Sequence, residues 1–300
     1  TGAARCSPAS RAPAAVRAST AKLAIWRQVS KSCRRNAARE TIAHALRVAE
    51  PDEVYHLAAQ SHVGTSFQVP DATFAVTAGG MVALLEAVRQ SGRNSRVYNA
   101  ATSELFGDSP PPQGEETPMR PQSPYAVAKL AGYWWVRCYR KAYGMHASNG
   151  ILHNHESPRR GEDFVTRKVT LAAARIKRGL QRELKLGNLD AARDWGHARD
   201  YTEAMWLMLQ QEMPDDYVIA TGEAHTVREL CEAAFTWHGL DWRDHVVVAA
   251  NFTRPAEVPA LCGDASKARA RLGWAPKTTF QQLVEEMAAA DDALVAKEGA

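Results

Sequence analysis

From Glu40 to Glu156 the chain alternates strand-like and helix-like segments, and this alternation restricts the possible folds more than any other feature. The strand-like segments are short and apolar, at residues 52–59, 95–103 and 146–155. The helix-like segments have amphipathic spacing, at residues 40–48, 71–92 and 125–143. Strands and helices that alternate at these lengths form a parallel sheet with right-handed crossovers. The sequence therefore predicts an α/β fold, a Rossmann-like parallel sheet flanked by helices.

The pattern loosens after Arg160, which indicates a second, smaller α+β domain. Helix-like segments cover residues 165–179, 201–211 and 227–239, and a last amphipathic helix follows LGWAPKT at residues 272–278. Strand-like segments cover residues 183–186 and 216–222. We expect a Rossmann-like domain at residues 40–160 and the smaller domain at residues 161–300. Segments near residues 198–222 are expected to return to the first sheet.

Residues 1–39 differ in composition from the rest of the chain. The first 49 residues hold ten Lys or Arg and 14 Ala but one acidic residue, Glu40. The remainder holds 27 basic against 32 acidic residues, so the formal net charge of +4 comes from this end. Ala, Arg, Ser and Pro without acidic residues predict an atypical, disordered segment. A nucleic-acid-binding arm is an alternative, but no interleaved aromatics or known module accompany it, and we expect no nucleic-acid partner.

Cysteine usage and hydropathy restrict the setting in which the chain works. The five cysteines, at positions 6, 33, 138, 231 and 262, are scattered and form no CxxC or Cys/His cluster. We expect free thiols in a reducing compartment, hence a cytoplasmic protein, and no metal site. No apolar run approaches the ~18–20 residues that cross a bilayer, so we expect no membrane partner.

Polar residues follow three successive strand-like segments. They form LAAQSH at residues 57–62, ATSE at residues 101–104 and HNHESPRRG at residues 153–161. In open parallel sheets, ligands bind outside the carboxyl ends of the strands. Three polar clusters at three successive strand ends are hard to explain by packing. The sequence therefore predicts a ligand site at this edge of the sheet.

Tyr125 and Lys129, in the segment SPYAVAKL, lie four residues apart in a predicted helix. Residues at this spacing share one helix face, with their Cβ atoms ~5–6 Å apart. Ionising a phenol of pKa ~10 at neutral pH costs about 4 kcal/mol, and a nearby ammonium lowers that cost. The pair predicts a phenol that acts as a base beside a lysine. An exposed polar helix face explains the same spacing, and the pair alone does not decide between them.

Thr102 and Glu104 follow the second strand-like segment. A hydroxyl just past a strand end can hydrogen-bond a substrate oxygen. A carboxylate two residues further on can transfer protons at carbon. The alternative for Glu104 is a loop carboxylate that caps a neighbouring backbone group.

Thr102, Tyr125 and Lys129 in this order resemble the short-chain dehydrogenase/reductase superfamily, in particular its extended branch, which acts on nucleotide sugars. Further motifs narrow the resemblance: PDEVYHLAAQSHV, TSELFG, SPYAVAKL, NGILHNHESPRRGEDFVTRKVT, LGNLDAARDWGHARDY and RPAEV. Together, from about Ala43 to the C-terminus, they look like the GDP-mannose 4,6-dehydratase family. A lone YxxxK is a weak signal, whereas NHESPRRGEDFVTRK combined with RDWGHARDY is a strong one.

The resemblance implies conversion of GDP-mannose to GDP-4-keto-6-deoxymannose with NADP as cofactor. Tyr125 would take the proton from the C4 hydroxyl while a hydride passes to NADP⁺. Thr102 would bind that oxygen, and Lys129 would hold the cofactor ribose. Glu104 would remove the C5 proton, acidified by the 4-ketone, and assist loss of water from C6, to which the hydride returns. The family also implies a homodimer or homotetramer.

Other positions carry over from the matching motifs one at a time. The implied cofactor contacts, besides Lys129, are Leu57, Ala58, Ala59, Gln60, Ser61, His155 and Arg160. The implied contacts to the GDP-sugar are Asn154, Glu156, Val165, Lys168, Arg193, Arg254 and Glu257. Arg and Lys suit the recognition of a diphosphate. We interpret Trp134, Trp135 and the segment LGWAPKTTF as packing residues.

The start of the chain departs from the family. A dinucleotide-binding domain opens with a strand, a Gly-rich turn and a helix whose N-terminus binds the pyrophosphate. Here no glycine stands between Gly2 and Gly64, and the 50 residues before PDEVY are fewer than the family has. We therefore expect the first strand–helix unit to be missing. Loss of the original N-terminus, with divergent or out-of-frame coding in its place, explains this better than a transit leader.

Two other functions stay open beside the dehydratase. The first is another reaction of the same scaffold, an epimerase or reductase. Glu104 argues against it, because enzymes of this scaffold that expel no hydroxyl generally lack a carboxylate there. The second is a non-catalytic remnant that binds nucleotide sugar or pairs with an intact homologue, which the missing glycine turn favours.

Overall fold

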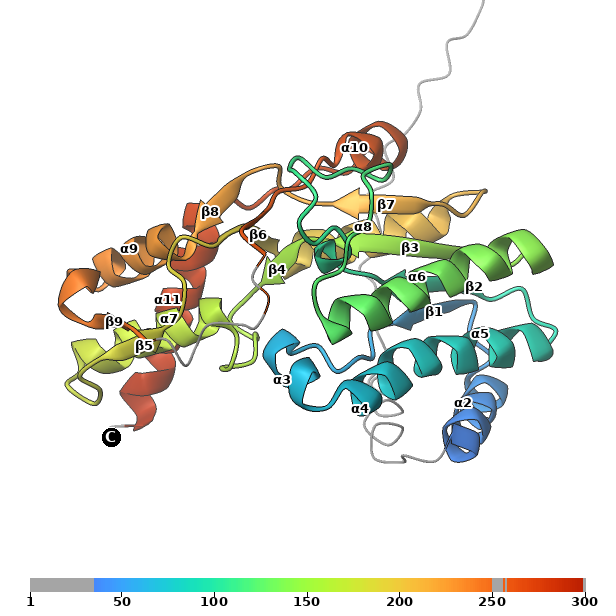
Figure 1. Cartoon of the computed structure of the whole chain (residues 1–300), viewed down its shortest axis with the longest axis horizontal. Coiled ribbons are helices and arrows are strands. Elements are labelled where there is room, and N and C mark those ends of the chain that lie inside the picture. Colours follow the sequence, from blue (N-terminus) through green and yellow to red (C-terminus); the bar gives the residue numbers. More distant parts are fainter. Residues whose placement is uncertain (1–34, 250–255, 257, 299–300) are drawn as a thin grey trace, which may run out of the picture.

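The computed structural model describes residues 35–249, 256 and 258–298. Its main sheet has parallel strands in the order β1-β2-β3-β7 (Figure 1). These strands are β1 Glu53–His56, β2 Arg96–Ala100, β3 Ala147–Leu152 and β7 Asp216–Ile219. The predicted Rossmann-like parallel sheet is thus confirmed. Within the described residues no strand precedes β1, which forms one edge of the sheet, as expected of a sheet without its first strand–helix unit.

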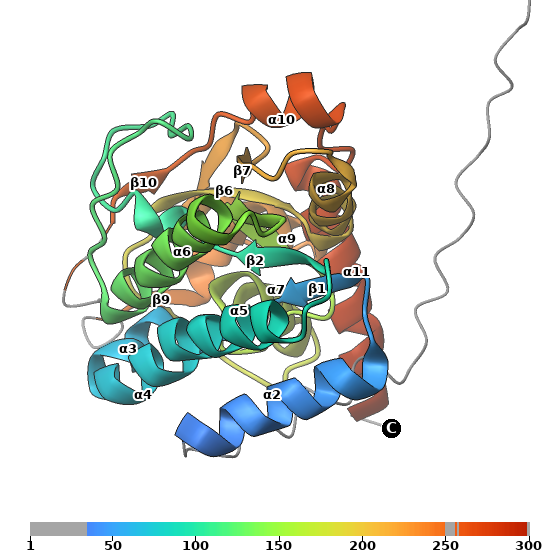
Figure 2. The same cartoon turned by 90° about the vertical axis from the view of Figure 1, so that its right-hand side faces the viewer.

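Helices cover both faces of the main sheet (Figures 1 and 2). The first face carries α2 Arg35–Ala49, α5 Gly80–Gln90 and α6 Pro124–Tyr143, and the other carries α8 Ala198–Gln210. Helix α2 begins ahead of Glu40, where we placed the boundary. The apolar core on the first face includes Leu84, Leu85, Val97, Val136 and Ala147, and on the second Tyr98, Ile151, Met205, Met208 and Val218.

The segment before α5 forms one long helix with a change of pitch. After the short helix α3 Val63–Gln68, the chain runs through α4 Pro70–Phe74 and a π-helical turn, η1 Ala75–Gly79, into α5. By length and composition this helix could cross a membrane, which the sequence analysis did not expect. Its 18-residue apolar window is 44% buried in the protein, because it packs between α2 and α6. A helix that packs over a sheet can have the same length and apolar composition.

The second part of the molecule is built around α7 Val165–Lys177, α9 Val227–Trp237 and α11 Phe280–Glu298. Parallel strands in the order β10-β6-β4 lie beside them, with β8 antiparallel to β6, and β5 pairs with β9. The bounds are β4 Asn154–Glu156, β5 Leu184–Leu186, β6 Ala192–His197, β8 Ala224–Thr226, β9 Val246–Val248 and β10 Ala260–Leu261; helix α10 is Ser266–Leu272, and the 3-10 turns are η2 Ser103–Leu105 and η3 Trp242–Asp244. Strand β6 was not predicted, because ARDWGH mixes charged and aromatic residues without strand alternation.

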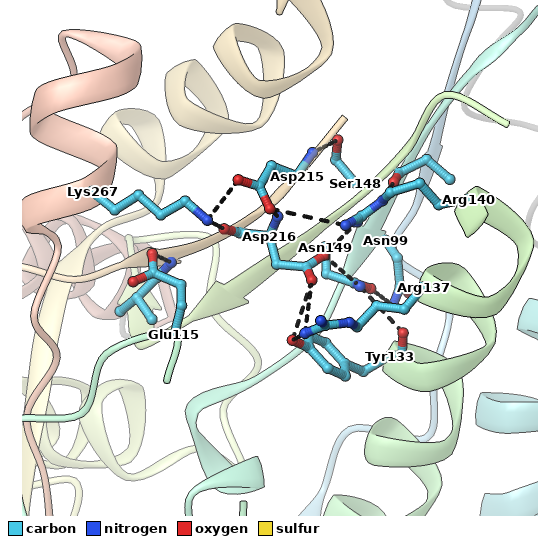
Figure 3. Close-up of polar contacts among 12 residues, drawn as sticks. Asn99, Glu115, Tyr133, Arg137, Arg140, Ser148, Asn149, Asp215, Asp216 and Lys267 are labelled. Atoms are coloured by element: carbon cyan, nitrogen blue, oxygen red, sulfur yellow. Dashed lines mark hydrogen bonds and ion pairs between the residues drawn. The ribbon is translucent and has the colours of Figure 1, made fainter. Parts of the chain in front are cut away.

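The C-terminal half of α6 is fixed to the sheet by polar residues, which we call the α6 anchor: the buried Asn99, Tyr133, Asn149 and Asp216 and the partly buried Arg140 (Figure 3). Asn99 Nδ2 donates to Asn149 Oδ1 and Asn149 Nδ2 to Asp216 Oδ1, each at 2.8 Å. The Tyr133 hydroxyl and the Arg140 guanidinium, both on α6, also donate to Asp216. The anchor therefore ties three neighbouring strands to the helix that carries Tyr125 and Lys129.

The two tryptophans of α6 correct one prediction. Trp134 and Trp135 expose 54% and 42% of their surface, so they do not pack in the core. Trp274, by contrast, is buried, and its indole donates to the Asp200 carbonyl oxygen at 2.8 Å, so the packing role expected there is confirmed.

Candidate active site

The predicted polar clusters meet at one edge of the main sheet. The loops after β1 and β2 and the segment after β3 all leave the carboxyl ends of parallel, adjacent strands. Gly150 in β3 allows the close packing required there, because a Cβ atom at this position would lie 2.3 Å from the Tyr98 hydroxyl. The site is therefore assembled by the sheet topology.

Local sequence fixes where α6 starts. The Ser123 hydroxyl accepts a hydrogen bond from the Ala126 amide at 3.1 Å and Pro124 occupies the first helical position. This start places Tyr125 and Lys129 one turn apart on the buried face of α6. The alternative of an exposed polar helix face is excluded, because the two side chains are 8% and 5% exposed.

Thr102 and Glu104 lie next to Tyr125. The Thr102 hydroxyl caps the turn η2 by accepting from the Glu104 amide at 3.3 Å, and it also hydrogen-bonds the phenol of Tyr125. Burial raises the pKa of Tyr125 to about 12. The bond to Thr102 opposes this rise, the charge of Glu104 adds to it, and the charge of Arg160 opposes it. The structure thus brings together the residues we call the Tyr125 cluster: Thr102, Glu104, Tyr125 and Lys129.

The Lys129 ammonium bonds to the end of β2. Its Nζ donates to the Ala100 carbonyl oxygen at 2.6 Å and lies 6.0 Å from the centroid of the Tyr125 ring. Burial lowers the pKa of the Lys129 ammonium to about 8. The sequence analysis assigned the lowering of the phenol pKa to this ammonium. In the structure the cation that lowers it is Arg160.

The half-buried Arg160 forms an ion pair with the buried Glu156. Arg160 Nε lies 3.1 Å from Glu156 Oε2, and the guanidinium carbon lies 3.7 Å from the centroid of the Phe164 ring. Burial raises the pKa of Glu156, while Arg160 and the hydroxyl of Thr166, which donates at 2.6 Å, oppose that rise. Burial lowers the pKa of nearby His155 to about 4, so its imidazole is neutral at pH 7.

The loop Leu57–Ser61, predicted to line the cofactor site, follows β1. Leu57 is 56% exposed. Gln60 shapes the loop, because its carboxamide accepts from the His62 amide at 2.6 Å and donates to the His62 carbonyl oxygen at 3.1 Å. A third contact, from Gln60 Nε2 to the Thr73 hydroxyl at 3.3 Å, ties the loop to α4. The loop stands at the same sheet edge as the Tyr125 cluster, with its side-chain contacts made within the loop and to α4.

The residues predicted to contact a GDP-sugar lie on the elements that adjoin this edge. Asn154 pairs in register with Trp195 on β6, and Val165 is the first residue of α7. Arg193 on β6 is buried and donates to the Val258 carbonyl oxygen at 2.9 Å. Lys168 Nζ donates to a carbonyl oxygen on β5 at 3.0 Å. Arg254 and Glu257 lie outside the described residues.

Sequence reasoning missed His153, the last residue before β4. It is 1% exposed, stacks with Phe106 at a centroid distance of 6.3 Å, and within the described chain neither ring nitrogen has a hydrogen-bond partner. Burial lowers the pKa of His153 to about 4. The sequence carried no signal for this, since a histidine in HNHESPRRG looks like another polar site residue.

The comparisons agree with this geometry. A family profile for GDP-mannose 4,6 dehydratase matches residues 37–287. GDP-mannose 4,6 dehydratase 1 of Arabidopsis thaliana is 57% identical over 257 residues, which cover 84% of this chain and 71% of the relative. The GDP-mannose 4,6-dehydratase of Vibrio cholerae is 47% identical over 280 residues, covering 83% and 75%.

Solved structures show the same fold. RMD from Pseudomonas aeruginosa, complexed with NADPH, has a TM-score of 0.75 and 26% identity, with 81% of this chain and 82% of that chain covered. The Thermus thermophilus UDP-glucose 4-epimerase in complex with NAD has a TM-score of 0.75 and 30% identity, with 84% and 81% covered.

The sheet, the Tyr–Lys pair on α6 and the polar strand ends define an extended short-chain dehydrogenase/reductase, a class whose members here include nucleotide-sugar enzymes that bind a nicotinamide cofactor. Within that class the chain belongs to the GDP-mannose 4,6-dehydratase family, because the family profile spans most of it and the relatives share about half of its residues.

Proposed function

We propose that this chain converts GDP-mannose to GDP-4-keto-6-deoxymannose and water, with NADP as its cofactor. The observation that carries the proposal is the contact of Thr102, Glu104 and Tyr125 at the carboxyl end of β2. A hydroxyl donor, a phenol and a carboxylate are the groups that oxidation at C4 and elimination across C5 and C6 require. A hydro-lyase of the nucleotide-sugar type follows from family membership and this arrangement.

Tyr125 is neutral in the resting protein. With a pKa of about 12, ionising it at pH 7 costs about 7 kcal/mol. A neutral phenol has no site for a second proton, so Tyr125 would accept the C4 hydroxyl proton as the phenolate, and the positive charges of Arg160 and of bound NADP⁺ would lower the cost of forming it. Thr102 holds the reacting oxygen, and the charge of Arg160 stabilises the negative charge that develops on the phenol.

Glu104 carries the part of the reaction that distinguishes a dehydratase. The 4-ketone acidifies the C5 hydrogen, and the Glu104 carboxylate removes it while the C6 hydroxyl leaves as water. The carboxylate is half-buried, and its negative charge adds to the rise in the pKa of Tyr125. The two groups are therefore close enough to act on one substrate. The hydride taken from C4 would return to C6 while a proton is added at C5, and the sugar would undergo no net change in oxidation state.

The described residues are suited to hold the nicotinamide and its ribose, one half of NADP. Lys129, the loop Leu57–Ser61, His155 and Arg160 stand at the strand ends where a nicotinamide and its ribose would lie. When bound, NADP accepts the hydride from C4 and donates it to C6. A strand, glycine turn and helix for the pyrophosphate do not occur among residues 35–249 and 258–298. NADP in preference to NAD is supported by the likeness to a structure complexed with NADPH.

We assign binding of the GDP-mannose diphosphate to the cations between the main sheet and the second part of the molecule. Lys168 and Arg193 are described there, and Arg254 belongs to the same predicted set. Burial lowers the pKa of Lys168 and the charge of Asp163 opposes this. Asn154, Glu156, Val165 and Glu257 complete the proposed sugar-nucleotide contacts, and a cytoplasmic location stays a prediction.

We further propose a homodimer that forms through the outer face of α4, η1 and α6. Phe74, Val76, Val127, Trp134 and Trp135 are exposed there, and no charged residue stands between positions 72 and 85. The two helical segments lie side by side (Figures 1 and 2). A two-fold axis would bring this face against the same face of a second copy. Light scattering should show a dimer for the native chain and a monomer for the Val76→Glu, Trp134→Glu variant, and a native monomer would contradict the proposal.

A second function, binding of nucleotide sugar without catalysis, also requires a test. It is favoured because the glycine turn does not occur among the described residues. A non-catalytic chain would bind GDP-mannose but not NADP⁺. Thermal shift separates the two functions: the dehydratase is stabilised by each ligand, the non-catalytic chain by GDP-mannose alone. An epimerase or reductase would bind both ligands but release a product that keeps its C6 hydroxyl, which mass spectrometry detects.

A further inference from the structure

The C-terminal helix α11 is connected to the active-site loop through one buried ion pair. Asp291 on α11 is fully buried, and Arg167 on α7 is nearly so. Arg167 Nε lies 2.6 Å from Asp291 Oδ1, in a charge contact that is not aligned as a straight hydrogen bond. The Thr170 hydroxyl donates to the other carboxylate oxygen at 2.6 Å. Two buried charges that meet in this way hold each other in a fixed geometry.

The remaining donors of Arg167 point to the loop that precedes α7. Its terminal nitrogen donates to the carbonyl oxygens of Pro158 and Arg160, the second at 3.2 Å. The loop turns tightly at this point, because the Arg160 amide donates to the Ser157 carbonyl oxygen at 2.9 Å. Arg167 therefore holds the backbone at Arg160, and the side chain of Arg160 is the cation described in the candidate active site.

Arg167 affects the site through Arg160, whose backbone it holds. The Arg160 guanidinium pairs with Glu156 at 3.1 Å and lies over Phe164, and its charge opposes the rise in the pKa of Tyr125. A planar guanidinium must be placed accurately to serve an ion pair and a ring face together. Backbone movement at residue 160 would displace all of these contacts.

We infer that Asp291 and Arg167 are positioning residues that hold residues 157–160 so that the Arg160 guanidinium stays paired with Glu156 and over the Phe164 ring. The inference deepens the proposed function and rests on it where cofactor binding is concerned. It makes the C-terminal helix a part of the site's support, although Asp291 is more than a hundred residues from Arg160 in sequence.

The test uses a double variant that keeps the core filled. Removing one partner of a buried ion pair leaves the other charge unpaired and threatens folding, whereas apolar residues in place of both are tolerated. We therefore choose Arg167→Met with Asp291→Leu. The matched control is Asp292→Asn, which breaks the neighbouring, more exposed ion pair of α11 with Arg178 and touches no residue of the loop.

Hydrogen exchange of the ligand-free protein is the first measurement. The double variant should exchange the amides of residues 159–164 at least tenfold faster than the native chain, and the control should not. Unchanged exchange in a folded double variant would overturn the inference. This result does not depend on activity or on any ligand.

The affinity for NADPH, followed by its fluorescence, is the second measurement. The double variant and Arg160→Ala should each lose about tenfold, and combining them should lose no more, because both act through the same guanidinium. Losses that multiply would overturn the inference, as would a double variant that binds like the native chain. A native chain that binds no NADPH would instead refute the proposed cofactor, and hydrogen exchange would still decide the loop's dependence on Asp291.

Discussion

The two ends of α6 use buried polar side chains in opposite ways. In the α6 anchor, the Asp216 carboxylate accepts hydrogen bonds from Asn149, Tyr133 and Arg140, and the donors and acceptors are matched across three strands (Figure 3). At the N-terminal end, Tyr125 and Lys129 are equally buried, and burial lowers the pKa of Lys129 to about 8. Burial raises the pKa of Tyr125 and of Tyr133 alike to about 12, so the two ends differ in the lysine. A matched polar cluster stabilises a fold, while a lysine whose pKa lies near neutral pH is suited to proton transfer.

Tyr125→Phe should give the largest effect. It removes the proposed proton acceptor without changing the shape of the core, so turnover of GDP-mannose should fall by about 10³-fold. Tyr133→Phe is the matched control, since it lies two turns further along the same helix and its hydroxyl serves Asp216. That control should lose about 1 kcal/mol of stability and keep its turnover. Equal losses of turnover in the two variants would remove the distinction between the ends of α6.

Asp216→Ala should be the most destabilising single change in the anchor. It leaves Arg140 and Asn149 without their buried acceptor, and we expect a loss of about 3–5 kcal/mol in urea unfolding. Asp215→Ala is the control, because the adjacent carboxylate is about half exposed and pairs with Lys267. A surface pair of this kind contributes up to about 1 kcal/mol. If the two variants unfold at the same urea concentration, the anchor has no special role.

Buried histidines should make the protein sensitive to acid. His56 and His153 each have a pKa lowered to about 4 by burial, from an ordinary 6.5. Because the unfolded chain binds protons at higher pH, stability is fully present above about pH 6.5 and is lost as pH falls toward 4. Each group would contribute about 3 kcal/mol to that loss. Unfolding midpoints measured from pH 7 to pH 4 should show the decline.

His153→Phe should have the smallest effect and the opposite sign. The ring is replaced by one of similar shape without polar atoms, so a burial cost of about 1–3 kcal/mol is removed at pH 7. The variant should also lose part of the acid sensitivity. A variant that is less stable than the native chain at pH 7 would show that the imidazole has a role other than packing against Phe106.

Much of the fold could be predicted from sequence, because strand–helix alternation and the start of α6 are local patterns. Tyr125, Lys129, Thr102 and Glu104 were proposed the same way, from strand ends and helix spacing. What sequence could not supply depends on distant contacts. Burial raises the pKa of Tyr125, and the cation that opposes this rise is Arg160, from the segment after β3, rather than Lys129 on the same helix.

The Asp291–Arg167 pair shows the same limit. Nothing in the sequence joins α11 to α7, and both residues look like ordinary helix-surface charges. The exposed Trp134 and Trp135 illustrate the reverse error, since large aromatic residues are expected in a core and here lie outside it. Whether a residue is buried depends on which helices and strands pack against it. The topology of the fold determines which elements those are.

The role of Glu104 is the central claim of this account, and one experiment addresses it directly. The Glu104→Gln variant is incubated with GDP-mannose and NADP⁺ in deuterated water, and the sugar is followed by NMR. We expect hydride removal at C4 to persist, with no deuterium at C5 and no loss of water from C6, while the native chain forms the 4-keto-6-deoxy product with deuterium at C5. Product formation by Glu104→Gln at the native rate would contradict the proposed mechanism.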